Sequence, residues 1–507
     1  MPDLAVSEEF VESMESPVVQ PERNVGRIIA RNTAFGLASQ VVLKIIGFLF
    51  NVLVINRLGD SSFGQYSIVL SWATLFAVLG DLGIAQFYTR EIARNRDRAS
   101  EWFWDVVVLR FCLAILASAV TTGGAIVFGY STEIVIAIGL YTSTYYLQAL
   151  LQPLVSIIEG NERIDITSVF SIVAQVVFMG SGAIFLFLGG SFVWLVVASL
   201  ITIPLLIIMS IWVIRKNKLS PPAFQLKLAL WKMLVRGGLP FAMIQVSLSF
   251  AFQSDNIFLS KYGYSDQQVG WYSAAYSLML TASVMIGSFN RAILPSLARE
   301  HEKNPDSIVP WYYRSVKALA FIGMPVAVGG MLLSDKLIGF LYPEYPPASI
   351  AFAILIWYIP MHLYTAFSGN LTTSIKKESS AAWIFLGEGL VNVALNFVLI
   401  PPFGVVGASF ATLLTEVFGS ALFYVLFRRT FGPGLNFKKT SRLAFSALLM
   451  GVVVFLLRDL GLGLGVLIAI GAAFYLMLVW LTRAFSQSEL EVFKALFQRV
   501  RLRLLPS

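Results

Sequence analysis

The stretch Gly64-Gln-Tyr66-Ser67 decides how this chain folds, because it recurs in the second half as Gly270-Trp-Tyr272-Ser273. In both copies another serine stands seven residues after the glycine, and an Ala-Arg pair follows, first Ala93-Arg94 and then Ala298-Arg299. The separations from glycine to arginine are 30 and 29 residues. This matching order and spacing predict an internal repeat, and therefore two similar halves.

The sequence around these motifs is too apolar for a protein whose surface faces water. Of the 507 residues, 57% are hydrophobic and 13% are charged, whereas soluble domains are roughly 45–50% apolar and roughly 25% charged. Most of the surface must therefore face lipid. Helices are the expected form, because each helix satisfies its own backbone hydrogen bonds. The sequence predicts an all-α, polytopic membrane protein.

Fourteen segments are long and apolar enough to cross a bilayer as helices, which takes about 20 residues each. We expect the first six and the next six to form two parallel bundles related by an axis along the membrane normal, followed by two further helices. The predicted spans are 32–57, 64–88, 104–129, 133–158, 165–188, 192–214, 239–260, 269–293, 315–333, 349–371, 380–400, 405–427, 441–457 and 463–482.

The distribution of lysine and arginine orients these spans. With the amino terminus inside, 31 of the 37 lysines and arginines fall in inside segments and 4 in outside segments. Cytoplasmic loops collect these residues, so both termini are predicted to be cytoplasmic in a multi-pass protein of the cell membrane. The other two, Lys44 and Arg110, lie within spans. The formal charge of +8 is thus a topology signal, and no nucleic-acid partner is expected.

Polar segments divide the chain. Surface-lying amphipathic helices are expected over 224–236 and 489–504, where apolar residues share a face; solvated connectors are the alternative. The predicted organisation is a disordered cytoplasmic tail (1–28), an N-terminal six-helix bundle (29–214), a cytoplasmic amphipathic linker (215–238), a C-terminal six-helix bundle (239–429), two additional transmembrane helices (430–484) and a cytoplasmic amphipathic tail (485–507).

Two cations within predicted spans are candidates for substrate contacts. Lys44 shares one helical face with Gln40 and Asn51, and such a polar stripe on an apolar helix points to a wet cavity. With Arg110 in the third span, Lys44 could bind an anionic headgroup in this cavity, since guanidinium groups bind phosphate in a bidentate manner. The alternative is that each cation pairs with a structural acid such as Asp81.

Acidic and amide side chains form a polar core in the second half. Glu388, Asn392 and Asn396 are spaced four residues apart and share one face, and Glu416 lies in the middle of the next span. Asp255 lies toward the outer end of the seventh span. Buried carboxylates of this kind can bind a proton or a metal cation and couple transport to an ion gradient. Hydrogen bonds that fix helix packing are the alternative.

Three charged residues lie near the inner ends of predicted helices, namely Asp81, Arg90 and Arg291. They can form ion pairs that close a cytoplasmic gate, or they can simply be charged residues at the cytoplasmic ends of membrane helices.

Catalytic and metal-binding motifs are missing. Cys112 is the only cysteine, and His301 and His362 are the only histidines, so neither a disulfide nor a zinc or haem site is expected. The sequence has no phosphate-binding loop, G-x-S-x-G or H-E-x-x-H motif. We therefore predict a protein that is not an enzyme, uses no cofactor and is not an ATP-driven pump acting alone.

Five motifs point to a known family. They are Phe63-Gly-Gln-Tyr-Ser67, Asp81-Leu-Gly83, Arg90-Glu-Ile-Ala-Arg94, Asp255-Asn-Ile-Phe-Leu-Ser260 and Pro402-Phe-Gly-Val-Val-Gly407. Together they resemble the polysaccharide-biosynthesis or O-antigen (Wzx-type) flippases of the multidrug/oligosaccharidyl-lipid/polysaccharide exporter superfamily, over nearly the whole chain.

This resemblance implies a V-shaped pair of bundles, alternating access, and export of an undecaprenyl- or dolichyl-diphosphate-linked oligosaccharide. Lys44 and Arg110 would then contact the diphosphate-sugar head. The expected partners are the lipid bilayer, the lipid-linked oligosaccharide, H⁺ or Na⁺ as coupling ion, and a polysaccharide polymerase or glycosyltransferases.

Other functions remain as alternatives. A cation-coupled multidrug antiporter would have acids in its cavity without central cations, so Lys44 argues against it. A lipid II flippase would have a similar basic cavity. A membrane glycosyltransferase needs a large outer loop or an acidic catalytic cluster, whereas the longest predicted outer loop is near 334–348.

Overall fold

The computed structural model describes residues 23–219, 224–283, 308–375, 377–432 and 438–485. Within these ranges the chain is helical and forms no strand, so the predicted all-α class is confirmed. The elements are α1 (Arg23–Ala77), the 3₁₀ turn η3 (Val78–Gly80), α2 (Ile84–Arg94), α3 (Arg98–Glu101), α4 (Phe103–Val127), α5 (Thr132–Gly160), α6 (Ile164–Phe187), α7 (Val193–Lys216), α8 (Ala229–Lys261), an unlabelled helix at 266–283, α10 (Ile308–Leu332), α11 (Ser334–Leu341), α12 (Ala348–Leu355), α13 (Tyr358–Ser374), α14 (Glu378–Phe431), α15 (Lys438–Leu457) and α16 (Leu464–Leu481).

The described residues contain nine helices long and apolar enough to cross a membrane, or up to eleven if two bent pairs each count as one span. Large apolar side chains of these helices are exposed, for example Trp383 at 70% and Trp480 at 77%. Exposed apolar area on this scale suits lipid as solvent and not water. The chain is a multi-pass membrane protein, and the count of fourteen spans stays a prediction.

Two of the helical elements are each interrupted by one glycine. α1 breaks at Gly59, with φ 73°, and α14 breaks at Gly404, with φ 54°. Glycine adopts such left-handed backbone conformations without a steric penalty. An unbroken helix of 54 residues would be about 80 Å long, far more than the ~30 Å of hydrocarbon. α14 therefore holds two of the predicted spans, and α1 holds the first predicted span and the beginning of the second. In each element the two parts meet at a single reversal.

Two other predicted spans are broken within their length. The span 64–88 ends as a helix at Ala77 and continues, after η3 and a turn at 81–83, as α2. The span 349–371 is divided into α12 and α13, which are bent by 40° relative to each other. Pro360 lies in the first turn of α13, where its missing N–H costs least.

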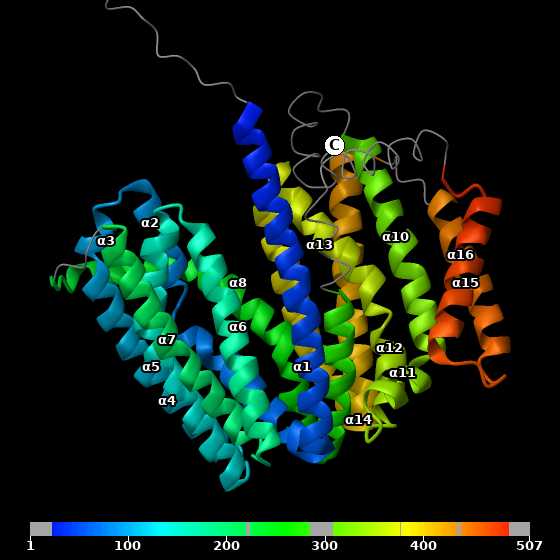
Figure 1. Ribbon diagram of the computed structural model, residues 1–507, viewed down its shortest axis with the longest axis horizontal. Coiled ribbons are helices and arrows are strands. Elements are labelled where there is room, and N and C mark those ends of the chain that lie inside the picture. Colours follow the sequence, from blue (N-terminus) through cyan, green and yellow to red (C-terminus); the bar gives the residue numbers. More distant parts are fainter. Residues whose placement is uncertain (1–22, 220–223, 284–307, 376, 433–437, 486–507) are drawn as a thin grey trace, which may run out of the picture.

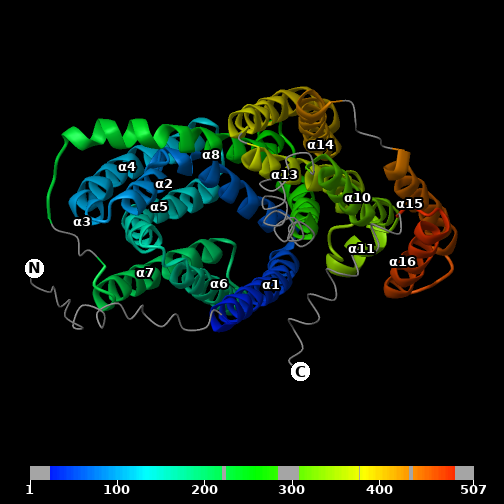
Figure 2. The same cartoon turned by 90° about the horizontal axis from the view of Figure 1, so that it is seen from above.

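The helices form two groups (Figure 1). One contains α2–α7, and the other contains α10–α16. The groups diverge toward the upper edge of Figure 1, where the amino end of α1 and helices α2 and α3 lie, and they converge toward its lower edge. α1 stands between them, as the view from above also shows (Figure 2). This is the V shape that the resemblance implied.

Helix α8 belongs to both groups. It runs along the edge of the first group and ends within the second (Figures 1 and 2). Near its amino end it touches the turn before α2, where a Cβ on Gly238 would lie 2.5 Å from the carbonyl oxygen of Leu82. A bend of 57° separates Ala229–Ser247 from Phe252–Lys261. The predicted linker 215–238 therefore ends inside α8, beyond the non-helical residues 224–228.

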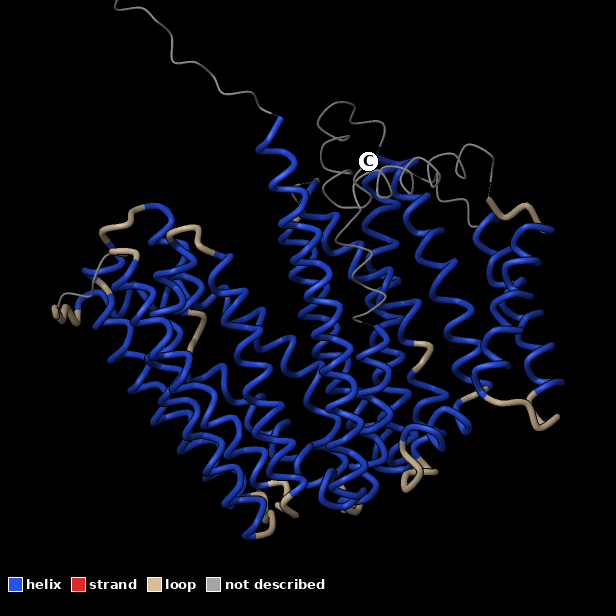
Figure 3. Tube along the Cα trace, in the orientation of Figure 1, coloured by secondary structure: helices blue, strands red, loops and turns tan. Residues whose placement is uncertain are grey.

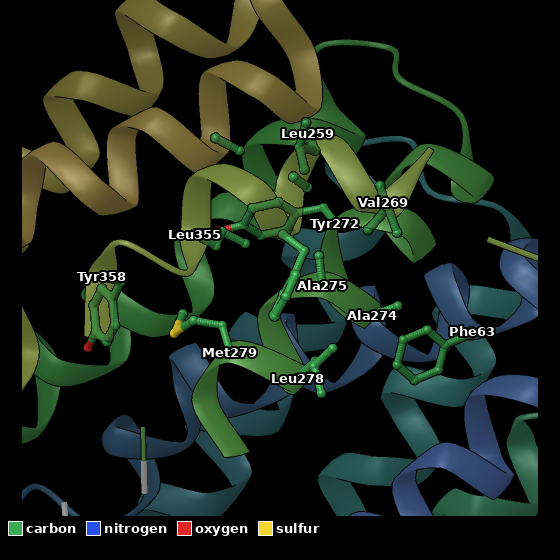
Figure 4. Packing of buried hydrophobic residues seen from close by; sticks show 14 of the residues in the cluster. Phe63, Leu259, Val269, Tyr272, Ala274, Ala275, Leu278, Met279, Leu355 and Tyr358 are labelled. Carbon is green, nitrogen blue, oxygen red and sulfur yellow. The ribbon is translucent and has the colours of Figure 1, made fainter. Parts of the chain in front are cut away.

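The helix at 266–283 lies at the centre of the larger hydrophobic core. Its residues Val269, Tyr272 and Met279 are almost fully buried. Figure 4 shows these side chains packed between Phe63 of the first half and Leu355 near α13. The tube in Figure 3 shows that most loops lie at the two ends of the helices, with short non-helical breaks inside both groups.

Three predictions concern residues that the structure does not describe. Most of the tail 1–28, the amphipathic segment 489–504 and the gate candidate Arg291 lie outside the described residues.

Candidate functional site

A cavity of about 340 Å³ lies within the C-terminal half, among α8, the helix at 266–283, α13 and α14. Its walls carry carboxylates, amides, hydroxyls and aromatic rings, and no lysine or arginine is among its described lining residues. The lining consists of Ser247, Phe252, Tyr276, Tyr358, His362, Thr365, Ala366, Gly369, Asn370, Phe385, Glu388, Asn392, Thr412, Thr415 and Glu416. Three residues of the predicted polar core, Glu388, Asn392 and Glu416, thus line a cavity.

Asp255 forms a hydrogen-bond cluster beside this cavity. Its side chain is 1% exposed and accepts three hydrogen bonds, one from the helix at 266–283 and two from α14. The donors are the Tyr272 hydroxyl, Asn396 Nδ2 at 2.5 Å and Thr412 Oγ1 at 2.8 Å. Asn396 Nδ2 also donates to Asn392 Oδ1 at 3.1 Å, which joins two residues of the predicted polar face. Buried carboxylates require such donors.

Glu416 and Glu388 line the cavity in different environments. Glu416 accepts a hydrogen bond from the Thr365 hydroxyl and lies 3.1 Å from His362 Nδ1. The imidazole of His362 stacks on the ring of Tyr358, with centroids 4.8 Å apart. Glu388 is 8% exposed, and its Oε1 has no hydrogen-bond partner among the described residues. This oxygen is an unsatisfied acceptor in a buried place.

The two copies of the sequence repeat meet where the helix groups converge. A Cβ on Gly64 would lie 1.8 Å from the carbonyl oxygen of Asp266, and a Cβ on Gly270 would lie 2.0 Å from that of Asp60. No side chain fits at either glycine. The contact is reciprocal, because each glycine faces the residue four positions before the other glycine.

Side chains repeat this reciprocity. Gln65 Nε2 donates to Asp266 Oδ2 at 3.0 Å, and Trp271 Nε1 donates to Asp60 Oδ2 at 3.1 Å. Both donors follow directly after a repeat glycine. We call the set Asp60, Gly64, Gln65, Asp266, Gly270 and Trp271 the repeat junction.

The serines seven residues after each glycine continue the pattern. Ser277 Oγ donates to Asn51 Oδ1 at 3.4 Å, and Asn256 Nδ2 donates to Ser71 Oγ at 2.9 Å. Each serine thus bonds to an asparagine of the other half. Asn51, predicted to line a cavity, forms one of these links between the halves.

The predicted substrate cations lie apart from the cavity and differ in burial. Lys44 is exposed on α1, next to Leu43, whose carbonyl accepts a hydrogen bond from Gln175 Nε2 at 3.3 Å. Arg110 is 4% exposed, and its Nε lies 3.1 Å from Asp81 Oδ1. This ion pair is the structural alternative anticipated for Arg110. Gln40 is on α1, and its side chain lies outside the described residues.

The two gate candidates that the structure describes, Asp81 and Arg90, do not pair with each other. Asp81 pairs with Arg110 and also accepts a hydrogen bond from the backbone N–H of Ala85 at 3.2 Å. Arg90 Nη2 lies 3.3 Å from Glu91 Oε1, and its guanidinium lies over the ring of Phe241 on α8 at 5.7 Å. Arg90 therefore contacts the helix that joins the two groups.

Sequence reasoning missed several residues around the cavity, notably Thr412, Thr365, His362, Tyr272 and Tyr276. Thr412 precedes Glu416 by one helical turn, and Tyr272 belongs to the repeat motif, so both had a signal that could have been used. The α13 residues His362 and Thr365 carried no signal in the sequence, because only the packing of α13 against α14 brings them to Glu416.

Comparison with known proteins gives matches along most of the chain. The family model for "Polysaccharide biosynthesis protein" matches residues 29–301. A protein of Haloferax volcanii named "Probable flippase AglR" is 22% identical over 416 residues, covering 78% of this chain and 82% of the relative. A Shigella flexneri protein, provisionally named an O-antigen transporter, is 22% identical over 421 residues, covering 79% of this chain and 98% of the relative.

Solved structures share the fold. The lipid II flippase MurJ in an inward closed conformation matches with a TM-score of 0.73 and 16% identity, over 89% of this chain and 98% of that structure. An inward-facing multidrug transporter of the MATE family matches with a TM-score of 0.60 and 14% identity, over 77% of this chain and 96% of that structure. At these identities the likeness concerns the arrangement of helices alone.

Proposed function

The chain belongs to the polysaccharide biosynthesis protein family, and on this premise we propose that it is a flippase. It moves a polyprenyl-diphosphate-linked oligosaccharide across the cytoplasmic membrane for the assembly of a surface glycan. The observation that carries this proposal is the match of the family model to residues 29–301. Two relatives, one named as a flippase and one as an O-antigen transporter, align with more than three quarters of the chain.

The flippase works by alternating access. The predicted topology puts Gly64 and Gly270, and hence the repeat junction, on the extracytoplasmic side. The helix groups diverge at the opposite end (Figure 1), which the same predicted topology makes the cytoplasmic end. This supports a state that receives substrate from the cytoplasm while the junction closes the outer side, and the junction must separate when the head is released outside.

The glycan head is held by its charge while the lipid tail stays in the bilayer. Lys44, exposed on α1 between the two groups, is the cation proposed to contact the diphosphate. Arg110 would join it only after leaving Asp81. The acids of the C-terminal half couple the movement to a proton or sodium gradient. A polysaccharide polymerase or glycosyltransferases would consume the product.

Expression of this chain in a strain that lacks its own flippase is expected to restore surface glycan, and Lys44→Ala is expected not to. Loss of a charge-assisted contact costs roughly 1.5–3 kcal/mol, which is roughly a 10- to 100-fold loss of transport. Glycan is measured by gel and lectin binding at matched protein level in the membrane. Lys216→Ala, which removes an exposed lysine stacked on Trp212, is the control. Full activity of Lys44→Ala would exclude its role.

A cation-coupled multidrug antiporter is the second candidate. The observation that favours it is the cavity with Glu388 and Glu416 and no lysine or arginine among its described lining residues. An antiporter would export cationic dyes and leave the glycan defect uncorrected, so dye accumulation in the same strain separates the two functions. Complementation of a strain that lacks its lipid II flippase tests in the same way whether this chain transports lipid II.

A further inference from the structure

The first turns of α8 carry an exposed face that is basic at its start and apolar after that. Lys232 and Arg236 are exposed one helical turn apart. Leu239 and Met243 continue the same face at helical spacing and are 50% and 51% exposed. Leu234, on the opposite face, is fully buried in the core of the N-terminal half. The helix therefore packs on that core with one side and leaves two cations and then two apolar side chains uncovered.

This order matches the boundary between lipid headgroups and acyl chains. Arg236 and Leu239 are three residues apart, which is about 4.5 Å along the helix axis. Charged headgroups attract cations at the membrane surface, and the acyl layer below favours exposed apolar side chains. The predicted topology puts the amino end of α8 on the cytoplasmic side. With that topology, α8 enters the acyl layer of the cytoplasmic leaflet just after Arg236.

The segment 224–228, which precedes α8, is attached to the N-terminal half. Asp105 Oδ1, at the start of α4, accepts a hydrogen bond from the backbone N–H of Lys227 at 2.8 Å. The ring of Phe224 lies 5.4 Å from that of Trp104, measured between centroids. Asp105 is fully buried, whereas Lys227 is exposed. The carboxylate thus fixes the backbone of Lys227 and leaves this lysine as a third exposed cation beside α8.

No acidic side chain neutralises these three cations. The chain has no aspartate or glutamate between Asp165 and Asp255. In the ranges that the structure describes, neither Lys227 nor Lys232 nor Arg236 takes part in an ion pair. An anionic partner from outside the chain would therefore meet uncompensated positive charge along this segment.

We propose that Lys227, Lys232 and Arg236 bind the phosphate groups of anionic phospholipids in the cytoplasmic leaflet, while Leu239 and Met243 contact the acyl chains. We call these five residues the α8 entry surface, and its role is independent of the proposed function. Basic clusters at the cytoplasmic end of a membrane helix attract anionic headgroups, and each cation adds roughly fivefold in affinity.

The spacing of the cations selects the kind of phosphate. Lys232 and Arg236 are about 6 Å apart along the axis, and Lys227 precedes the helix. Because the three cations follow one another along the segment, several phosphodiester headgroups fit them better than one diphosphate does. Bound headgroups would hold the amino end of α8, the helix that belongs to both groups, at the membrane surface.

The test is site-specific lipid binding by the purified full-length protein in mixed micelles. Cys112→Ser removes the native thiol, and Gln225→Cys, at an exposed position beside the surface, carries a fluorescent label. Dibrominated phosphatidylglycerol quenches the label when it binds nearby, and dibrominated phosphatidylcholine with the same acyl chains is the comparison without net charge. At low salt the anionic lipid should reach half-quenching at a roughly 100-fold lower mole fraction, and high salt should remove most of this preference.

Lys232→Gln/Arg236→Gln should lower the preference for phosphatidylglycerol to about fivefold, and each single variant should lower it by about fivefold. Arg428→Gln/Arg429→Gln, which removes two exposed cations near the end of α14, is the matched control and should leave it unchanged. Lys232→Arg/Arg236→Lys keeps both charges and should also leave it unchanged. Thermal unfolding in detergent without lipid should give the same midpoint for all variants.

Two results would overturn the proposal directly. They are equal quenching by the two lipids in the wild type, and an unchanged preference in Lys232→Gln/Arg236→Gln. Geranylgeranyl diphosphate tests the other source of lipid phosphate. If it displaces phosphatidylglycerol at an equimolar amount, the surface binds the diphosphate head of a polyprenyl substrate, and the assignment to phospholipid is wrong.

Discussion

Gly64→Ala is expected to abolish most transport while the protein still inserts into the membrane. The added methyl carbon would lie 1.8 Å from the carbonyl oxygen of Asp266, and backbone cannot move aside as a flexible side chain can. Overpacking of this kind costs about 1–3 kcal/mol. Because the cost falls on the closed junction alone, the equilibrium between the two states should shift about 5- to 150-fold toward the separated one.

The measurement is disulfide cross-linking of cysteines placed at Gln65 and Asp266, whose side chains are bonded in the closed junction, together with glycan transport. Cross-linking should fall with Gly64→Ala and equally with Gly270→Ala. Gly123→Ala on α4 is the matched control, because a Cβ there meets nothing within 4 Å. Undiminished cross-linking in both junction variants would show that this contact does not control the closed state.

Asp81→Asn is expected to destabilise the N-terminal half, because it leaves the buried guanidinium of Arg110 without its charge partner. Breaking a buried ion pair from one side costs about 3–5 kcal/mol. Asparagine keeps an oxygen that can accept the hydrogen bond of the Ala85 N–H, so the loss should come from the charge. Thermal unfolding in detergent should show a clearly lower midpoint.

The double variant Asp81→Asn/Arg110→Leu should recover most of this stability, since both charges are gone. Asp165→Ala is the matched control: its partner Arg163 is exposed, and such pairs are worth about 0–1 kcal/mol. If Arg110 instead binds substrate, Arg110→Leu alone should stop transport at an unchanged unfolding midpoint. The two roles of Arg110 therefore give opposite results in the same pair of assays.

The sequence predicted the straight helices well and the broken ones poorly. The spans 133–158 and 165–188 correspond closely to α5 and α6, because uniform apolar runs between polar ends determine such helices. The span 64–88 failed at Asp81, where Gly83 adopts φ 71° and packs against the carbonyl oxygen of Gly238. Hydropathy does not report that contact, because it depends on a helix far away in the chain.

The candidate site was predicted in its parts and not in its assembly. Helical spacing placed Asn392 and Asn396 on one face, and the structure bonds them to each other. The contact of Glu388 with the helix turn that carries Glu416 depends on the reversal at Gly404, and the involvement of His362 depends on the packing of α13. For Lys44 the sequence identified an unusual residue, and its proposed role awaits the transport assay.

The reciprocal contacts of the repeat junction also limit how this gene can be recombined. Each half supplies a glycine for the other half's backbone and an acid for the other half's donor. A chimera that joins residues 1–238 of this chain to the second half of a distant relative would therefore carry one member of each pair without its counterpart. Exchanges that preserve these few positions should yield working hybrids, and the substrate preference of each half could then be assayed separately.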